Sequence, residues 1–347
     1  MRVEDIVDVV RLAEFDSIVD VRSPAEFAAD RIPGAISCPV LDDAERERVG
    51  TLYKQVSSFE AKKVGAALVA RNIARHLDER FRDRPRDWRP LVYCWRGGTR
   101  SGAMAHILRQ VGWKAAQLEG GYKSFRHRVV ADLAALPAGF SFTVLCGPTG
   151  SAKSRLLEAL VRRGAQALDL ERLAEHRGSV LGAMPDTPQP TQKAFETSIW
   201  HALSGFDPSR PVYVEAESRK IGALQVPDAL LERIRASACV RLDIERPARV
   251  AFLRREYSHF LERPDELLAR LAHLTTLHGH AVIDGWREMV QAGAWDELVE
   301  GLLARHYDPA YDRSSRHNFT QIQGARSIVG GDLSPAGIES LAAAIDS

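Results

Sequence analysis

One short stretch has the residue types of a phosphate-binding loop. In "GPTGSAKS", Gly147 to Ser154, glycines follow an apolar strand pattern and precede a helical one. Backbone N–H groups at a helix N-terminus bind phosphate oxygens, while the lysine reaches the terminal phosphates and the serine ligates Mg²⁺. We expect Ser154 to contact magnesium. The expected phosphate contacts are Gly147, Thr149, Gly150, Ser151, Lys153 and Ser154.

Ala152 departs from the usual loop, which has glycine before the lysine. A backbone with positive φ, or one that phosphate approaches closely, favours glycine because it has no Cβ. The sequence therefore predicts weaker diphosphate binding than an Ala152→Gly variant would show.

A second reactive stretch is "LVYCWRGGTRSG", in which Cys94 ends a predicted strand and a helix begins near Arg100. Backbone N–H groups and a helix N-terminus favour a thiolate, so we expect Cys94 to be a nucleophile. The forked guanidinium of Arg100 could hold a tetrahedral oxyanion. Five residues separate Cys94 from Arg100, which Ser101 follows, and this spacing also fits cysteine phosphatases. A sulfurtransferase is a further alternative. The other expected loop residues are Trp95, Arg96, Gly97, Gly98 and Thr99.

Acidic residues follow two further strand patterns, and arginines recur on later helices. The acids could bind metal or substrate, or cap strand ends in solvent; the arginines could close over phosphates or lie on a solvated helix face. We take as candidate substrate or lid residues Asp169, Arg177, Glu215, Glu217 and Arg254.

Strand and helix patterns alternate along the chain, which predicts an α/β protein with mostly parallel sheets. We expect a long helical stretch over 41–77 and a mainly helical region from about Pro264. Proline and glycine at 137–139 mark a joint. The predicted domains are 1–137, 138–310, and a C-terminal extension, 311–347, packing on the second domain.

Composition limits the function classes. The 347 residues carry a net charge of +1, so an RNA partner would need a local basic patch, for which Arg71 to Pro90 is the candidate unless it is a solvated helix face. Four widely spaced cysteines suggest neither a zinc knuckle nor a disulfide framework. With no long apolar run and an acidic N-terminus, we expect a cytoplasmic protein without a membrane partner.

The block "DVRSPAEFAADRIPGAISCP" followed by the Cys94 loop resembles the rhodanese family over roughly the first 135 residues. The resemblance implies a rhodanese-like α/β domain whose loop cysteine carries, or attacks, a sulfur or selenium atom. It gives Asp20, Arg22 and Glu26 structural roles.

Nearly the whole chain resembles bacterial tRNA 2-selenouridine synthases, through "YCWRGGTRS", "DLERLAEHRGSVLG", "PQPTQKAFE", "VEAESRKIG" and "HYDPAYDRS". The resemblance implies a P-loop NTPase-like second domain and action on wobble 2-thiouridine of tRNA. A geranyl group from geranyl diphosphate would be added to sulfur, and selenium from selenophosphate would then replace S-geranyl. It implies these small-molecule phosphates and tRNA as partners, possible Mg²⁺, and no tightly bound organic cofactor. Two alternatives stay open: a small-molecule kinase with a rhodanese appendage, and a non-catalytic tRNA- or anion-binding adaptor.

Overall fold

The computed structural model describes residues 5–347, except the side chain at position 316. The chain divides into two compact units. One contains 5–132 with 196–201, and the other contains 133–195 with 202–347. The helix α8 (Gln192–Gly205) contributes residues to both.

The first unit is built on a five-stranded sheet in which all strands are parallel, in the order β1-β5-β4-β2-β3. Its strands are β1 (Ile6–Val7), β2 (Ser17–Asp20), β3 (Ile36–Ser37), β4 (Pro90–Tyr93) and β5 (Ala116–Leu118). Every residue of the central strand β4 is buried. A parallel strand covered on both faces reads as a continuous apolar run, as "PLVY" does.

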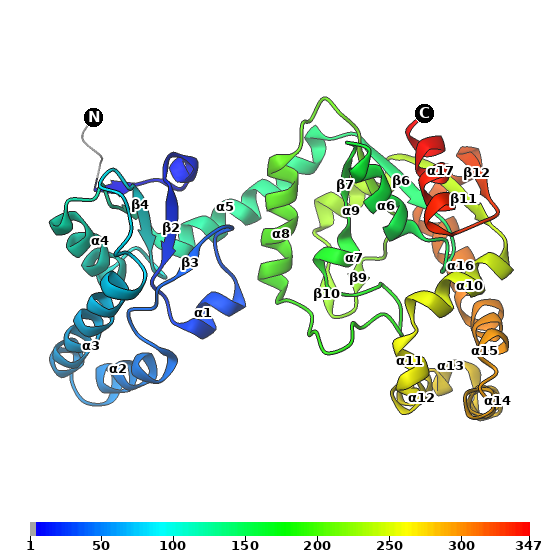
Figure 1. Cartoon of the computed structure of the whole chain (residues 1–347), viewed down its shortest axis with the longest axis horizontal. Coiled ribbons are helices and arrows are strands. Elements are labelled where there is room, and N and C mark those ends of the chain that lie inside the picture. Colours follow the sequence, from blue (N-terminus) through cyan, green and yellow to red (C-terminus); the bar gives the residue numbers. More distant parts are fainter. Residues whose placement is uncertain (1–4) are drawn as a thin grey trace. The chain divides into compact units, whose positions relative to one another are not determined.

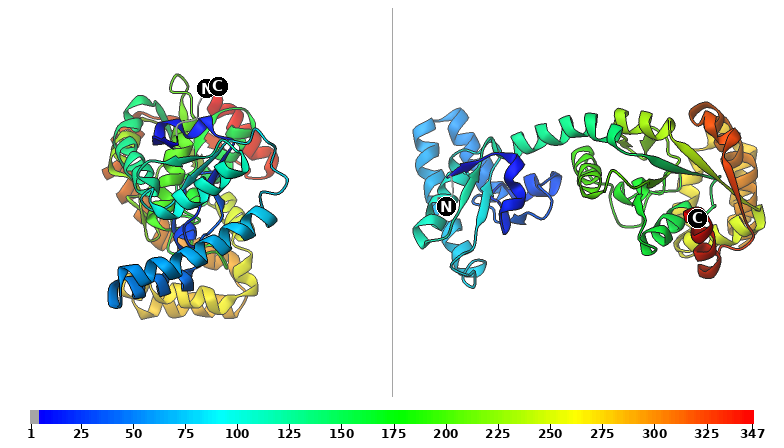
Figure 2. Two further views of the ribbon diagram at one scale, coloured as in Figure 1. Left: turned by 90° about the vertical axis from the view of Figure 1, so that its left-hand side faces the viewer. Right: turned by 90° about the horizontal axis from the view of Figure 1, so that it is seen from above.

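Helices cover both faces of this sheet, with α3 and α4 on one side and α1 and α5 on the other (Figures 1 and 2). The helical segments are η1 (Val9–Glu14), α1 (Pro24–Ala29), α2 (Asp43–Gln55), α3 (Ser58–Glu79), α4 (Thr99–Val111) and α5 (Gly121–Ala135). The predicted helical stretch over 41–77 is two helices. Ser57 lies between them as the N-cap of α3, where its hydroxyl accepts a hydrogen bond from the Phe59 N–H at 3.1 Å.

The second unit has another parallel sheet, in the order β12-β11-β6-β8-β7. Its strands are β6 (Phe142–Cys146), β7 (Gln166–Leu168), β8 (Val212–Glu215), β11 (Ala238–Ile244) and β12 (Arg326–Gly330), and β9 (Lys220–Ile221) and β10 (Leu224–Gln225) form a separate antiparallel pair. The α/β prediction is confirmed. The strand β12, within the region expected to be mainly helical, was not predicted.

Two helices, α6 (Lys153–Arg162) and α17 (Pro335–Asp346), pack together on one face of this sheet in a core that includes Leu156, Leu160 and Leu341. The residues 311–347 thus add both a strand and a core helix to the second unit. Helices α11 to α15 form a neighbouring cluster around Trp286 (Figure 1). The remaining segments are η2 (Leu136–Gly139), α7 (Leu170–Leu173), α9 (Asp228–Arg235), α10 (Arg246–Glu256), α11 (His259–Glu262), α12 (Pro264–Ala272), α13 (Thr275–His278), α14 (His280–Gln291), α15 (Trp295–Leu302), η3 (Leu303–Tyr307), α16 (Asp308–Asn318) and η4 (Thr320–Gly324).

Within residues 5–347, no helix combines the length and the apolar character needed to cross a bilayer.

Candidate active sites

Cys94 lies directly after β4, at the start of the loop that leads into α4, and is 4% exposed. Its Sγ accepts hydrogen bonds from the Gly98 N–H and the Ser101 hydroxyl, both at 3.2 Å. Burial alone would raise the pKa of Cys94, but the hydrogen bonds from Ser101 and from backbone N–H groups, including those of Gly98 and Arg96, outweigh it and lower the pKa. The loop therefore stabilises a thiolate.

Glycines allow the close packing behind this loop. Gly97 has φ +63°, and a Cβ there would lie 2.6 Å from the Leu118 carbonyl oxygen. Gly121, on the turn after β5, has φ +58°, and a Cβ there would clash with the Cys94 carbonyl oxygen. That carbonyl accepts the Tyr122 N–H at 2.8 Å. The sequence analysis missed this second turn, although the paired glycines of "EGGY" after a strand were a visible signal.

Gln117 of β5 also supports the loop and was not predicted. Its side-chain amide donates to the carbonyl oxygens of Gly97 and Gly98 at 2.5 and 3.1 Å, and lies 3.0 Å from the Ser101 hydroxyl. These contacts hold in place the two groups that donate to Cys94, so Gln117 is a positioning residue.

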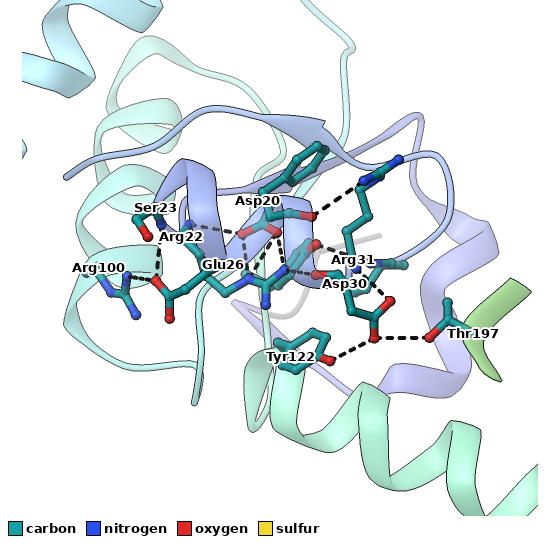
Figure 3. A network of polar contacts seen from close by, with 12 residues as sticks. Asp20, Arg22, Ser23, Glu26, Asp30, Arg31, Arg100, Tyr122 and Thr197 are labelled. Atoms are coloured by element: carbon teal, nitrogen blue, oxygen red, sulfur yellow. Dashed lines mark hydrogen bonds and ion pairs between the residues drawn. The ribbon is translucent and has the colours of Figure 1, made fainter. Parts of the chain in front are cut away.

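Arg100 lies in the first turn of α4 and donates to Glu26 at 2.9 Å (Figure 3). Arg46 reaches the same Glu26 oxygen at 3.1 Å. Burial acts to raise the pKa of Glu26, but these cations, Arg100 foremost, lower it overall. The guanidinium is thus anchored beside the loop. Of the other predicted loop residues, Trp95 packs against Tyr122 with ring centroids 5.2 Å apart, and Arg96 and Thr99 are exposed.

The rhodanese-like block forms a buried polar network (Figure 3). Arg22, 1% exposed, pairs with Asp20 at 2.6 Å and donates to the Asp30 carbonyl oxygen at 2.6 Å. The Asp30 carboxylate accepts the hydroxyls of Tyr122 at 2.7 Å and of Thr197, in the 196–201 segment of this unit, at 3.0 Å. Buried ions need such complete pairing, which fits a structural role.

The phosphate loop joins β6 to α6 in the second unit. Ala152 is the N-cap of α6 and has φ +57°, the left-handed region that glycine normally occupies. Its side chain is 4% exposed and packs in the core cluster with Leu156. The Lys153 ammonium donates to the Gly147 carbonyl oxygen at 3.0 Å, which holds it across the loop, and Gly150 has φ +86°.

Arg249 of α10 supports the phosphate loop from outside. Its guanidinium donates to the Thr149 carbonyl oxygen at 3.0 Å and makes a two-pronged pair with Asp308, both contacts at 2.8 Å. Arg249 is 4% exposed. The Ser151 hydroxyl is buried and has no hydrogen-bond partner among the described residues. The sequence signal for Asp308 was the "YDP" stretch, which was noted only as part of the family resemblance.

A cluster of carboxylates lies beside Ser154. The Ser154 hydroxyl donates to Glu171 at 2.9 Å and lies 3.4 Å from Glu215, which also accepts the Glu171 N–H at 3.0 Å. Burial and the neighbouring carboxylates raise the pKa of Glu215 well above its usual range. Burial is also the main cause that raises the pKa of Asp169 to about 6 and of Glu217 to about 8. Glu215 is fully buried and Asp169 is 9% exposed, so these two acids are not strand-end caps in solvent.

A cavity of about 670 Å³ opens at the phosphate loop, a volume typical of small-molecule sites. Arg177 lines it, donates to the Glu256 carbonyl oxygen at 2.6 Å and lies over the Tyr257 ring at 4.6 Å. Arg254 does not line this cavity but lines an apolar pocket beside it; it is exposed and pairs with Asp296 of α15 at 2.9 Å. The predicted residues that line it are Gly147, Thr149, Gly150, Lys153, Ser154, Asp169, Arg177 and Glu217.

An apolar pocket adjoins this cavity. The two share Thr149, Ser179, Leu253, Tyr257 and Tyr307 as lining residues. The rest of the pocket wall comes mainly from α11, α12 and α15, and includes Phe260, Leu267, Trp295, Leu298 and Leu302. A polar anion site thus continues into an apolar space within the second unit.

Comparison with known proteins agrees with this geometry. Residues 7–128 match the rhodanese-like domain, and residues 140–270 match the tRNA 2-selenouridine synthase AAA domain. The tRNA 2-selenouridine synthase of Alcanivorax borkumensis is 32% identical over 94% of this chain and 98% of its own length, and that of Marinobacter nauticus is 32% identical over 90% and 91%. The Nitrosomonas europaea enzyme is 35% identical over 69% of this chain and 63% of its own length. The chain therefore belongs to the tRNA 2-selenouridine synthase family of tRNA-modifying enzymes.

Proposed function

We propose that this enzyme replaces the sulfur of wobble 2-thiouridine with selenium in two stages. In the first, the sulfur attacks C1 of geranyl diphosphate, the C–O bond breaks, and diphosphate leaves. In the second, selenium from selenophosphate adds to C2 of the base, and the C–S bond breaks to release the geranyl thiolate. The observation that carries this proposal is the presence of a thiolate loop and a phosphate-loop cavity in one chain.

The phosphate loop suits the departing diphosphate. Lys153 and the N-terminus of α6 supply positive charge where the leaving group gains negative charge, which lowers the barrier to breaking the C–O bond. The adjoining apolar pocket suits the geranyl chain, because burying hydrocarbon there removes it from water and places its reactive end at the phosphate loop.

The residues at Ser154 fit Mg²⁺ chemically, because a hydroxyl and carboxylate oxygens are its preferred ligands. Ser154 and Glu171 would hold it. No group of three or more His, Cys, Asp or Glu side chains within 5–347 is arranged as a metal site, so water and the diphosphate would complete its shell. When bound, the ion would neutralise part of the diphosphate charge.

Cys94 suits selenium delivery. Forming a perselenide from selenophosphate with release of phosphate would oxidise selenium and require a separate oxidant. Attack of the thiolate on phosphorus requires no oxidant. The S–P bond forms, the P–Se bond breaks, and selenium takes up one proton and leaves as HSe⁻. Water then hydrolyses the phosphocysteine. The N–H groups of the loop, with Arg100, would hold the phosphoryl oxygens.

Nucleoside mass spectrometry of tRNA treated with purified enzyme tests both stages. We expect Lys153→Met to block S-geranylation, and Cys94→Ser to block conversion of geranylated tRNA to selenouridine without affecting geranylation. Cys38→Ser is the matched control, because Cys38 is a buried thiol of the same unit whose pKa burial raises to about 11. Conversion of geranylated tRNA by Cys94→Ser at the wild-type rate would contradict the role of Cys94.

An assay of ATP hydrolysis by the same purified enzyme distinguishes the proposed function from that of a small-molecule kinase. Phosphate release from ATP that continues steadily, unaffected by tRNA or geranyl diphosphate, would favour that alternative. Intact tRNA binding without any modification would favour a binding adaptor.

A further inference from the structure

Helices α2 and α3 meet at a corner of the first unit (Figure 1). Three large apolar side chains at this corner are exposed. Tyr53 is 60% exposed, Val56 is 67% exposed and Phe59 is 65% exposed. They follow one another at intervals of three residues, through the last turn of α2 and the first turn of α3. Single exposed apolar residues are ordinary, whereas grouped ones are typical of surfaces that contact other molecules.

The same corner is basic. Residues 50–63 contain three lysines and a single acid, Glu60. Lys54, Lys62 and Lys63 are all exposed, and Lys63 lies 5.2 Å from the centre of the Phe59 ring while pairing with Glu60 at 2.7 Å. Aromatic faces beside mobile cations are the features by which proteins bind unpaired bases and the phosphates between them.

The corner is connected to the Cys94 loop through α2. Arg46, near the start of α2, touches Glu26, which holds Arg100 in the first turn after the loop. Tyr53 follows Arg46 by seven residues, which is two helical turns, so it lies on the same face of α2 and about 10 Å further along the axis.

The basic stretch Arg71 to Pro90, the RNA candidate from sequence, is less suited to this task. Arg82 pairs with Asp78, and Arg89 pairs with Asp16 at 2.9 Å. Arg84 lies over the Trp88 ring at 5.1 Å. Three of its seven arginines thus contact groups within the protein, and no large apolar side chain of this stretch is exposed for stacking.

We propose that the α2–α3 corner is a docking surface for the single-stranded loop of the tRNA substrate. Tyr53 and Phe59 stack on unpaired bases, and the lysines contact the adjacent phosphates. The proposal rests on the proposed function, in which an unpaired wobble base must reach the enzyme. An amphipathic membrane contact is less consistent with the corner, because it would need a continuous apolar face along a helix.

Binding of an anticodon stem-loop RNA to the full chain tests the proposal, with affinity measured by fluorescence anisotropy over a salt series. We expect the double variant Tyr53→Ser/Phe59→Ser to weaken binding by about tenfold or more, through lost stacking. Lys54→Ala/Lys62→Ala should make the slope of the logarithm of the binding constant against the logarithm of the salt concentration less steep, by an amount that corresponds to about two phosphate contacts. Val111→Ser, at a 54% exposed position of α4, is the matched control and should bind as wild type.

The readouts separate this proposal from the proposed function. The double variant Tyr53→Ser/Phe59→Ser should have a higher KM for tRNA and the same turnover as wild type at saturating tRNA. If wild-type enzyme modifies the RNA and the double variant binds it within twofold of wild type, the docking proposal is wrong. If the variant instead abolishes self-association seen for wild type, with RNA affinity unchanged, the corner is a contact between copies of this chain. Wild-type enzyme that neither binds nor modifies tRNA would refute the proposed function itself.

Discussion

The Ser101 hydroxyl lies 3.2 Å from the Cys94 sulfur and donates to it from the first turn of α4. Ser101 is fully buried, so water does not replace this hydrogen bond when the sulfur is charged. Burial acts to raise the pKa of Cys94, and Ser101, seven positions further along the chain, contributes most to the hydrogen bonding that lowers it.

Ser101→Ala should raise the pKa of Cys94 and slow its alkylation. The thiolate is the reactive form, so its alkylation rate rises with pH through the pKa, and the variant's profile should shift to higher pH. Peptide mass spectrometry after timed iodoacetamide treatment measures this for each cysteine. Cys38, whose pKa burial raises to about 11, is the internal control and should react slowly in both proteins. Identical profiles for Cys94 would show that the hydroxyl does not tune the sulfur.

Gly121→Ala should distort the Cys94 loop, because a methyl group at position 121 would meet the Cys94 carbonyl oxygen. Gly112 is a matched control: its φ is also positive, at +109°, but a Cβ there has no neighbour within 4 Å. Both variants bear the strain of a left-handed alanine, about 1–2 kcal/mol, and only Gly121→Ala adds the clash. Gly121→Ala should therefore lower the free energy of unfolding and change the rate of Cys94 alkylation more than Gly112→Ala does. Equal effects of the two variants would show that the loop adjusts to the methyl group.

Ala152→Gly tests the unusual phosphate loop. The left-handed conformation at Ala152 belongs to the backbone of the loop itself, so its strain affects folding more than binding, and we expect pyrophosphate affinity to rise by no more than about threefold. In folding, the relief of about 1 kcal/mol is offset by the lost methyl contact, about 0.8 kcal/mol, and by a more flexible unfolded chain. Calorimetric titration with magnesium pyrophosphate measures the affinity. A large gain would show that the methyl group obstructs the ligand, as the sequence first suggested.

Glu26→Gln should destabilise the protein at neutral pH by roughly 1–3 kcal/mol, since it removes the charge that Arg100 and Arg46 share. The folded pKa of Glu26 is lowered, so its contribution is present above the unfolded value, about 4.3, and disappears as pH falls through the folded pKa. Urea unfolding at neutral and acidic pH should show the difference from wild type shrinking on acidification. Glu14→Gln, which breaks an exposed pair with Arg11, should have little effect at either pH.

The sequence predicted the parts of this protein that depend on local pattern. The strand before Cys94 and the strand before Gly147 are continuous apolar runs that end in glycine-rich loops, so both could be placed directly. The strand β12 was missed because its residues are largely exposed, Val329 at 77%, and only pairing with β11 makes it a strand.

Long-range partners could not be predicted. Arg249 and Arg254 lie on the same helix, yet Arg249 supports the phosphate loop and Arg254 pairs with α15. Their different roles depend on which segments fold against each side of α10. Gln117 is similar: nothing in "AQLE" indicates that its amide meets a loop about twenty residues earlier.

The late position of β12 has a consequence for biosynthesis. All five strands of the first sheet lie within residues 6–118, so that sheet can assemble while the ribosome is still making the second unit. The second sheet gains its fifth strand only after residues 326–330 emerge, more than eighty residues after β11. During that interval β11 presents an unpaired edge, and nascent chains stalled there would be clients for chaperones.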